Sequence, residues 1–259
     1  MKGPLRVLRG QQESPLRRGV YILPSLLTTG NLLAGFYSIT LTLSGDFARA
    51  AVFVLVAHVL DGLDGRVARF TRTTSRFGIE YDSLADLVAF GVAPAVLAYR
   101  WALVPWGDWG WLAASLYVAC GALRLARFNV QVDSVEKRSF VGLPIPAAAD
   151  VIAAVVLLYY YVGGAGATHK QATLLLLTYT LAALMVSNFR YFSFKELPFR
   201  RRQAFWILFL AIVLVQVTIA IPQVMLFLAS AGYALSGPVR GVLTLRRWRR
   251  QRAAKAAAA

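Results

Sequence analysis

The chain has few of the residues that build disulfide frameworks or zinc sites. Its 259 residues include one cysteine and two histidines. A single thiol can form no internal disulfide, and structural zinc sites take four Cys or His ligands. Cys120 lies in an apolar segment, where we expect it to serve as a packing residue. The cysteine content therefore says little about the redox compartment.

Charged residues are also scarce, at 15% of the chain, and only 12 of them are acidic, against 28 Lys and Arg. Hydrophobic residues make up 58%, above the roughly 45–50% of soluble domains. This composition predicts a polytopic membrane protein. The formal charge of +16 could suggest a nucleic-acid partner, but the basic residues lie between apolar segments rather than in one patch. We therefore expect membrane lipids, and no nucleic acid, as partners.

Apolar runs of about 18–22 residues match the thickness of a bilayer core at about 1.5 Å rise per residue. They predict an all-α polytopic membrane protein with about eight transmembrane helices. Six or seven are the alternatives, because Pro222 leaves the last division open. The expected spans are 22–43, 48–68, 83–104, 109–129, 146–164, 171–189, 203–221 and 222–236.

Basic residues predict the orientation, since cytoplasmic loops collect Lys and Arg. With eight spans, only Arg49, Arg100 and Lys170 would lie outside the cell. Both termini would be cytoplasmic, as a basic arm at 1–21 and a basic tail at 237–259 flanking a transmembrane domain at 22–236. We expect the arm and tail to attract anionic lipids, at about 1 kcal/mol per Lys or Arg. No small-residue cleavage site follows the first apolar stretch, so we expect that span to be retained.

Four aspartates lie at the cytoplasmic ends of two expected spans. Asp61 and Asp64 are three residues apart, and Asp82 and Asp86 are four apart, so each pair shares a helical face. The polar loop at 70–78 would make the two helices antiparallel neighbours. The four carboxylates can therefore meet, and carboxylates at membrane depth need a compensating partner.

Carboxylate oxygens are hard ligands that suit Mg²⁺, Mn²⁺ or Ca²⁺, whereas zinc would call for nearby Cys or a His pair. His58 is one turn before Asp61. We expect it to be a hydrogen-bonded helix residue outside the metal shell, with metal ligation as the alternative.

Small and basic residues accompany the aspartates. Gly65 and Gly78 lack a Cβ and permit close approach of a backbone or ligand, and Ala68 continues the small face. Arg69 could pair with a carboxylate or a phosphate. Either glycine alone would suit helix packing, but with metal and basic groups they favour a pyrophosphate pocket.

The full string is Asp61-x-x-Asp64-Gly65-x-x-Ala68-Arg69, eight residues, Gly78-x-x-x-Asp82-x-x-x-Asp86. It resembles without departure the signature of the CDP-alcohol phosphatidyltransferases, which displace CMP from a CDP-linked lipid with an alcohol. The resemblance implies two divalent cations, Mg²⁺ or Mn²⁺ with Ca²⁺ as an alternative, bound by Asp61, Asp64 and Asp82 with help from Asp86. It also implies that Asp86 is the general base.

The same resemblance places the CDP moiety against Gly65, Ala68 and the loop around Ser75, and it implies a homodimer in the bacterial cytoplasmic membrane with a cytoplasmic active site. The candidate CDP-lipid-binding residues are Gly65, Ala68, Arg69, Ser75, Gly78 and Asn31. Asn31 lies within the first expected span, where it could also reach the cavity of the alcohol acceptor, or bond a neighbouring helix instead.

Three further stretches resemble the phosphatidylserine synthase branch of the family, which implies CDP-diacylglycerol and L-serine as substrates. They are LPSLLTTGNLLAGF at 23–36, CGALRLARFNV at 120–130 and FVGLPIPAAA at 140–149. Arg124 and Arg127 share a helical face, and either could bind the serine carboxylate with its two-pronged guanidinium. Asn129 follows as a third candidate, although the two arginines also fit an ordinary positive-inside helix end.

Asp150 starts the fifth expected span and needs a partner, either the serine ammonium or an inner-loop arginine; we favour the structural pairing. Glycerol 3-phosphate, inositol phosphate and choline are alternative acceptors. An alternative of another class is a divalent cation transporter, which would carry acids on several helices along a path. The aspartates instead cluster at one inner face beside an arginine, which suits an anionic substrate better.

Overall fold

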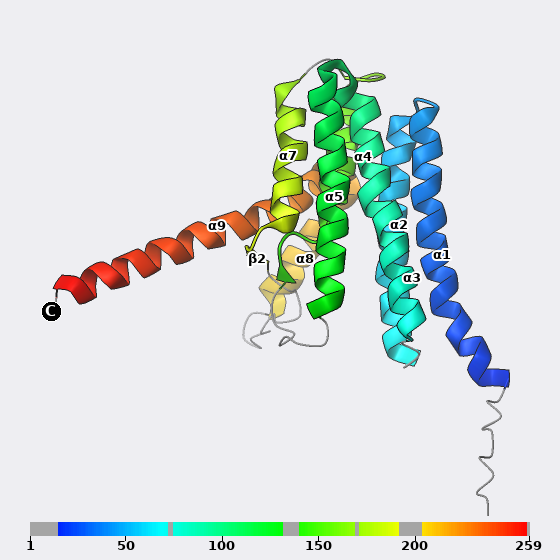
Figure 1. Cartoon of the computed structure of the whole chain (residues 1–259), viewed down its shortest axis with the longest axis horizontal. Helices are drawn as coiled ribbons and strands as arrows, with labels where there is room; N and C mark the ends of the chain where they lie inside the picture. Colours follow the sequence, from blue (N-terminus) through cyan, green and yellow to red (C-terminus); the bar gives the residue numbers. More distant parts are fainter. Residues whose placement is uncertain (1–14, 72–74, 132–139, 169–170, 192–203, 258–259) are drawn as a thin grey trace, which may run out of the picture.

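The computed structural model describes residues 15–71, 75–131, 140–168, 171–191 and 204–257 (Figure 1). Its α-helices are α1 (Pro15–Leu43), α2 (Phe47–Thr71), α3 (Arg76–Asp86), α4 (Ala93–Ala98), α5 (Asp108–Gln131), α6 (Ile145–Tyr161), α7 (Ala172–Val186), α8 (Ala204–Ala220) and α9 (Pro222–Ala257). Two π-helical stretches, η1 (Leu87–Val92) and η2 (Tyr99–Leu103), and the 3₁₀ turn η3 (Val104–Trp106) link α3, α4 and α5.

The fold is helical, as expected, apart from one small ladder. Strands β1 (Phe140–Val141) and β2 (Arg190–Tyr191) pair antiparallel, with Phe140 opposite Tyr191. This pairing was not expected from the sequence, because two-residue strands carry no periodic signal. The ladder joins the segment before α6 to the segment after α7.

Four described segments are long and apolar enough to cross a membrane: Pro24–Leu43, Arg76–Trp106, Asp108–Val130 and Pro222–Leu243. Helices α6 and α7 are shorter but also apolar. Helix α2 is not among the four, and its last turns carry Asp61, Asp64 and Arg66. These segments agree with an all-helical integral membrane protein.

The connections between helices gather at opposite ends of the bundle, as Figure 1 shows. The α1–α2 turn, the η3–α5 turn and the α6–α7 segment share one end, where the Thr168 amide donates to the Trp101 carbonyl at 2.9 Å. Arg49 and Arg100 lie near these connections, while Lys170 falls outside the described residues. The end of α2, the start of α3 and the start of α1 lie at the other end.

The third expected span is one continuous helical segment that begins at Arg76, seven residues before the predicted start at 83. Helix α1 packs closely against η1 in this segment: a Cβ on Gly35 would lie 2.5 Å from the Ala89 Cα. Only glycine allows this approach. The contact holds α1 beside the helix that carries Asp82 and Asp86.

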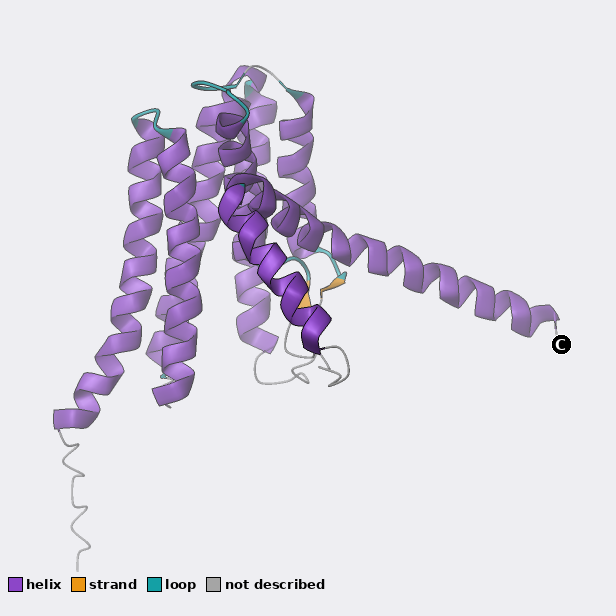
Figure 2. Ribbon diagram, turned by 180° about the vertical axis from the view of Figure 1, so that it is seen from behind, coloured by secondary structure: helices purple, strands orange, loops and turns teal. Residues whose placement is uncertain are grey.

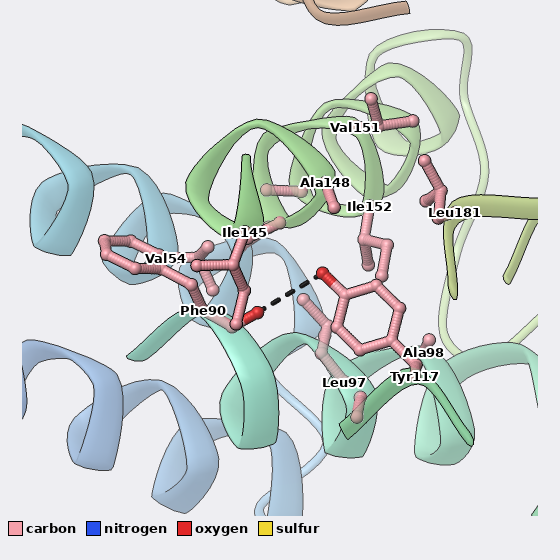
Figure 3. Packing of buried hydrophobic residues seen from close by; sticks show 14 of the residues in the cluster. Val54, Phe90, Leu97, Ala98, Tyr117, Ile145, Ala148, Val151, Ile152 and Leu181 are labelled. Carbon is pink, nitrogen blue, oxygen red and sulfur yellow. Dashed lines mark hydrogen bonds between the residues drawn. The ribbon is translucent and has the colours of Figure 1, made fainter. Parts of the chain in front are cut away.

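A core of buried side chains ties α2, η1, α4, α5, α6 and α7 together (Figure 3). Tyr117 is fully buried, and its hydroxyl donates to the Phe90 carbonyl at 3.2 Å. Its polar atom is therefore satisfied inside the apolar core. Cys120 belongs to the same core, which confirms the expected packing role.

Helix α9 runs without a break through the expected boundary between a last span ending at 236 and a tail starting at 237. Figures 1 and 2 both show it projecting from the bundle at a wide angle rather than running antiparallel to its neighbours. Pro238 lies inside it and cannot donate to the carbonyl of Ala234. The Tyr191 hydroxyl donates to that carbonyl instead, at 3.1 Å.

A Cβ on Gly237 would lie 2.3 Å from the Tyr191 ring, so glycine admits this side chain against the helix. Burial, together with the nearby Tyr233, raises the pKa of Tyr191 to about 12. The phenol therefore keeps its proton at neutral pH and remains a donor. The Tyr191 hydroxyl thus replaces the hydrogen bond that Pro238 cannot make, and α9 continues past the proline.

Candidate functional site

Carboxylates from α2 and α3 meet where these two helices are joined. One oxygen from each of Asp61, Asp64 and Asp82 lies within 4.8 Å of the others. Asp64 is buried, and Asp61 and Asp82 are partly buried. The expected convergence of the two helices' aspartates is confirmed for these three. Asp86 follows one turn after Asp82 and is buried as well.

Helix α1 supplies hydrogen bonds to one carboxylate of each pair. The Thr28 hydroxyl donates to Asp64 Oδ2 at 3.0 Å, and the Asn31 side-chain amide donates to Asp86 Oδ1 at 3.0 Å. Thr28 and Asn31 are three residues apart, so they share the face of α1 that looks at the site. Thr28 was not among the residues expected at the site, although its spacing from Asn31 in an apolar span could have indicated it.

The donor set fits divalent cations. All four side chains are carboxylates, and Asp82 Oδ1 is buried without a hydrogen-bond partner. The ion pairs found in the described part of the chain are Arg49–Asp46 and His58–Asp150, so neither neutralises these acids. Clustered, partly buried negative charge of this kind is stable with a bound cation, and oxygen ligands suit Mg²⁺, Mn²⁺ or Ca²⁺.

Some of the residues expected to face the CDP moiety leave room for a ligand, and others take part in the local helix structure. Among the described residues, a Cβ on Gly65 would have only the Arg69 guanidinium near it, at 4.0 Å, so this part of the structure leaves room for a ligand beside α2. Ser75 caps the start of α3, where its hydroxyl accepts from the Gly78 amide at 2.9 Å. Ser75 and Gly78 therefore also build the helix start that holds Asp82. The side chain of Ala68 is outside the described part of the structure.

The three candidate serine-binding residues of α5 differ in their surroundings. Arg124 is buried, interacts electrostatically with Asp86, and has no partner for its Nε. Arg127 is instead bonded to the Asn188 side chain at 3.0 Å. Asn129 donates to the Ser83 hydroxyl at 2.9 Å and so links α5 to α3. Of the three, Arg124 is the one that interacts electrostatically with an aspartate of the site.

Asp150 has a partner that was not considered from the sequence. Its carboxylate lies 2.7 Å from His58 Nδ1, so its structural partner is this histidine and not the inner-loop arginine that we favoured; the serine ammonium stays a prediction. The reason is that α2 and α6 pack side by side and bring the two side chains together. The expectation that His58 is a hydrogen-bonded helix residue is confirmed.

Comparison with known proteins agrees with this geometry. The chain is 41% identical over 198 residues to the CDP-diacylglycerol–serine O-phosphatidyltransferase of Helicobacter pylori, covering 76% of this chain and 83% of the relative. It is 36% identical over 174 residues to the enzyme of that name from Bacillus subtilis, covering 67% and 92%. It is also 44% identical over 133 residues to the archaetidylserine synthase of Methanothermobacter thermautotrophicus, covering 51% and 56%.

The sequence model described as CDP-alcohol phosphatidyltransferase matches residues 21–187, a range that contains all four aspartates and both α1 residues that bond to them. The chain therefore belongs to the CDP-alcohol phosphatidyltransferase family.

Proposed function

We propose that the protein transfers a phosphatidyl group from CDP-diacylglycerol to the hydroxyl of L-serine, giving phosphatidylserine and CMP. The observation that carries this proposal is the meeting of Asp61, Asp64 and Asp82 on the family signature. The choice of serine is supported by relatives named for that acceptor, which are 36% and 41% identical over most of their length.

The four aspartates would hold two divalent cations, Mg²⁺ or Mn²⁺, with Ca²⁺ as an alternative. When bound, such ions neutralise the pyrophosphate and stabilise the charge that develops on the departing phosphate. On the donor side, Gly65 leaves space beside α2 among the described residues, and Arg69 lies in the last turn of the same helix. Together with Ala68 and the Ser75–Gly78 helix start, they would receive the CDP moiety.

Asp86 would act as the general base. Asn31 bonds to its Oδ1 and leaves Oδ2 to accept a proton. A new bond would form between the serine hydroxyl oxygen and the phosphorus that carries diacylglycerol. The bond from that phosphorus to the oxygen shared with CMP would break, the hydroxyl proton would pass to Asp86, and CMP would leave with the bonding electron pair. Arg124, Arg127 and Asn129 are the candidate contacts to serine.

For the protein as a whole, we propose a homodimer in the bacterial cytoplasmic membrane with about eight spans. The transmembrane catalytic domain at 22–236 would lie between the basic arm at 1–21 and the basic tail at 237–259. Both termini and the active site would face the cytoplasm, because the α2–α3 connection lies at the basic end of the bundle (Figure 1).

The test is an acceptor panel. Purified protein would be mixed with CDP-diacylglycerol, Mn²⁺ or Mg²⁺, and L-serine, glycerol 3-phosphate, inositol phosphate or choline, and CMP release and the lipid product would be measured. Release that depends on L-serine and yields phosphatidylserine is the expected result. Release with glycerol 3-phosphate alone would overturn the assignment of the acceptor.

A further inference from the structure

Two buried side chains that interact with Asp86 have polar atoms without partners among the described residues. Asn31 is fully buried, and its side-chain oxygen accepts no hydrogen bond. Arg124 is 8% exposed, and its Nε finds no acceptor. Unpaired buried polar atoms are costly, so natural proteins keep them where a ligand or solvent completes the pairing.

The orientation of Asn31 follows from its neighbour. Asp86 Oδ1 lies 3.0 Å from the amide nitrogen, and an ionised carboxylate can only accept hydrogen bonds. Turning the amide around would place two acceptors against each other. The Asn31 oxygen must therefore point away from Asp86, where it can accept a hydrogen bond from a ligand.

Arg124 is a positively charged donor, whereas the Asn31 oxygen is an acceptor. It comes from α5, whereas Asn31 comes from α1, and it interacts electrostatically with the same Asp86 carboxylate. The Phe128 ring, 5.9 Å from its guanidinium carbon, packs against the cation. Neither of the ion pairs found among the described residues involves Arg124.

We propose that Asn31 and Arg124 form the acceptor site and select a zwitterionic hydroxy amino acid. Arg124 binds its carboxylate, the Asn31 oxygen accepts from its ammonium, and Asp86 receives the hydroxyl proton. This inference rests on the proposed function and moves Asn31 from the CDP-lipid side of the site to the acceptor side.

The arrangement would also disfavour other acceptors. A phosphorylated alcohol would bring a second negative charge to a site with one buried cation and an unpaired amide oxygen facing it, with Asp86 nearby. Ethanolamine lacks the carboxylate that would satisfy Arg124. Sites built to pair with a polar group discriminate strongly against analogues that lack it, because their own buried atoms remain unpaired.

The test pairs each residue with the ligand group it should recognise. Ethanolamine is serine without the carboxylate, and 3-hydroxypropionate is serine without the ammonium. For Asn31→Leu we expect the kcat/KM ratio of L-serine to 3-hydroxypropionate to fall at least about tenfold, while the ratio of L-serine to ethanolamine stays within about threefold. Arg124→Gln should show the reverse pattern.

Ser38→Ala is the matched control, since Ser38 is also buried in α1 but bonds to the Ala50 carbonyl, at 2.8 Å. If Asn31→Leu does not fold, Asn31→Ala takes its place. Without any substitution, L-alanine, which keeps both charged groups, should compete with L-serine, whereas propionate and ethylamine should not.

Equal losses with all acceptors in both variants would overturn the assignment, as would competition by propionate or ethylamine equal to that of L-alanine. If the wild-type protein releases no CMP with L-serine, the proposed function itself fails, and the wild-type assay alone reveals this.

Discussion

Asp86 differs from the other three aspartates in its surroundings. Asn31 bonds to one of its oxygens, and the buried cation Arg124 lies nearby, whereas Asp61, Asp64 and Asp82 bring their oxygens together. Asp82 and Asp86 carry the same carboxylate group and lie one helical turn apart, but their neighbours differ. We infer that Asp86 accepts the proton in addition to helping the other three aspartates hold the cations.

Asp86→Asn tests this role. The amide keeps the shape of the side chain but is a poor base, so we expect turnover to fall by about 10²–10⁴-fold. The Kd for CDP-diacylglycerol should change little, because the other three carboxylates remain. Both quantities can be measured on the same purified sample. Equal losses of binding and turnover would assign Asp86 a purely structural or metal-binding role.

At the scale of the helices, the site depends on how α1 is held against its neighbours. Gly35 lets α1 touch the backbone of η1, and α1 also packs along α2, so Thr28 and Asn31 lie beside Asp64 and Asp86. The hydrogen bonds to the carboxylates therefore depend on how α1 packs against both neighbours.

We expect Gly35→Ala to lower stability, because the new Cβ would meet the Ala89 Cα at 2.5 Å and backbone atoms cannot move aside as a flexible side chain can. Overpacking of this kind costs about 1–3 kcal/mol. The measurement is the thermal unfolding midpoint in detergent. Gly232→Ala is the control, since no atom of the described residues lies within 4 Å of its Cβ position. An unchanged midpoint for Gly35→Ala would refute the contact.

The His58–Asp150 pair is a second contact between elements, joining α2 to α6 one turn from Asp61. We expect His58→Leu and Asp150→Leu each to destabilise the protein, and the double variant to lose less than their sum, with a coupling of about 0.5–1 kcal/mol. The free energies of unfolding of the wild-type protein, the two single variants and the double variant measure this coupling. Strictly additive losses of stability would argue against the pair.

Asp150→Asn separates this role from serine binding. A KM for L-serine equal to that of the wild-type protein is expected, because His58 already occupies the carboxylate. A large increase in this KM, at unchanged stability, would restore the serine ammonium as its partner.

At the scale of the whole molecule, the two ends of the bundle differ in charge and in chemistry. The end with Arg49 and Arg100 holds short turns, and the opposite end holds the aspartates and the α2–α3 connection (Figure 1). A cytoplasmic site at the basic end would let a soluble amino acid and a lipid head group arrive at the same place.

Cysteine labelling tests this orientation, and the one native thiol, Cys120, is buried and gives little background. In intact cells, a membrane-impermeant maleimide should label Arg49→Cys and leave Arg76→Cys unlabelled until the membrane is opened. Both positions are near helix starts, in α2 and α3 respectively. Labelling in the opposite order would invert the proposed topology.

Much of the site could be predicted from the spacing of residues within each helix. Residues three or four apart in a helix must share a face, so spacing alone pairs Asp61 with Asp64 and Asp82 with Asp86. No such rule predicts contacts between segments that are far apart in the sequence. Thr28 and the partner of Asp150 were missed for this reason, and so was the continuation of α9, which depends on a tyrosine from β2.

The sequence by itself determined that this is a helical membrane protein of the CDP-alcohol phosphatidyltransferase family, because apolar run length, charge and the spacing of a signature are properties of the chain alone. Only the tertiary structure decided which neighbours each charged group has. Asn31 at Asp86, Thr28 at Asp64 and His58 at Asp150 come from separate helices, and helix packing alone brings such side chains within hydrogen-bond distance.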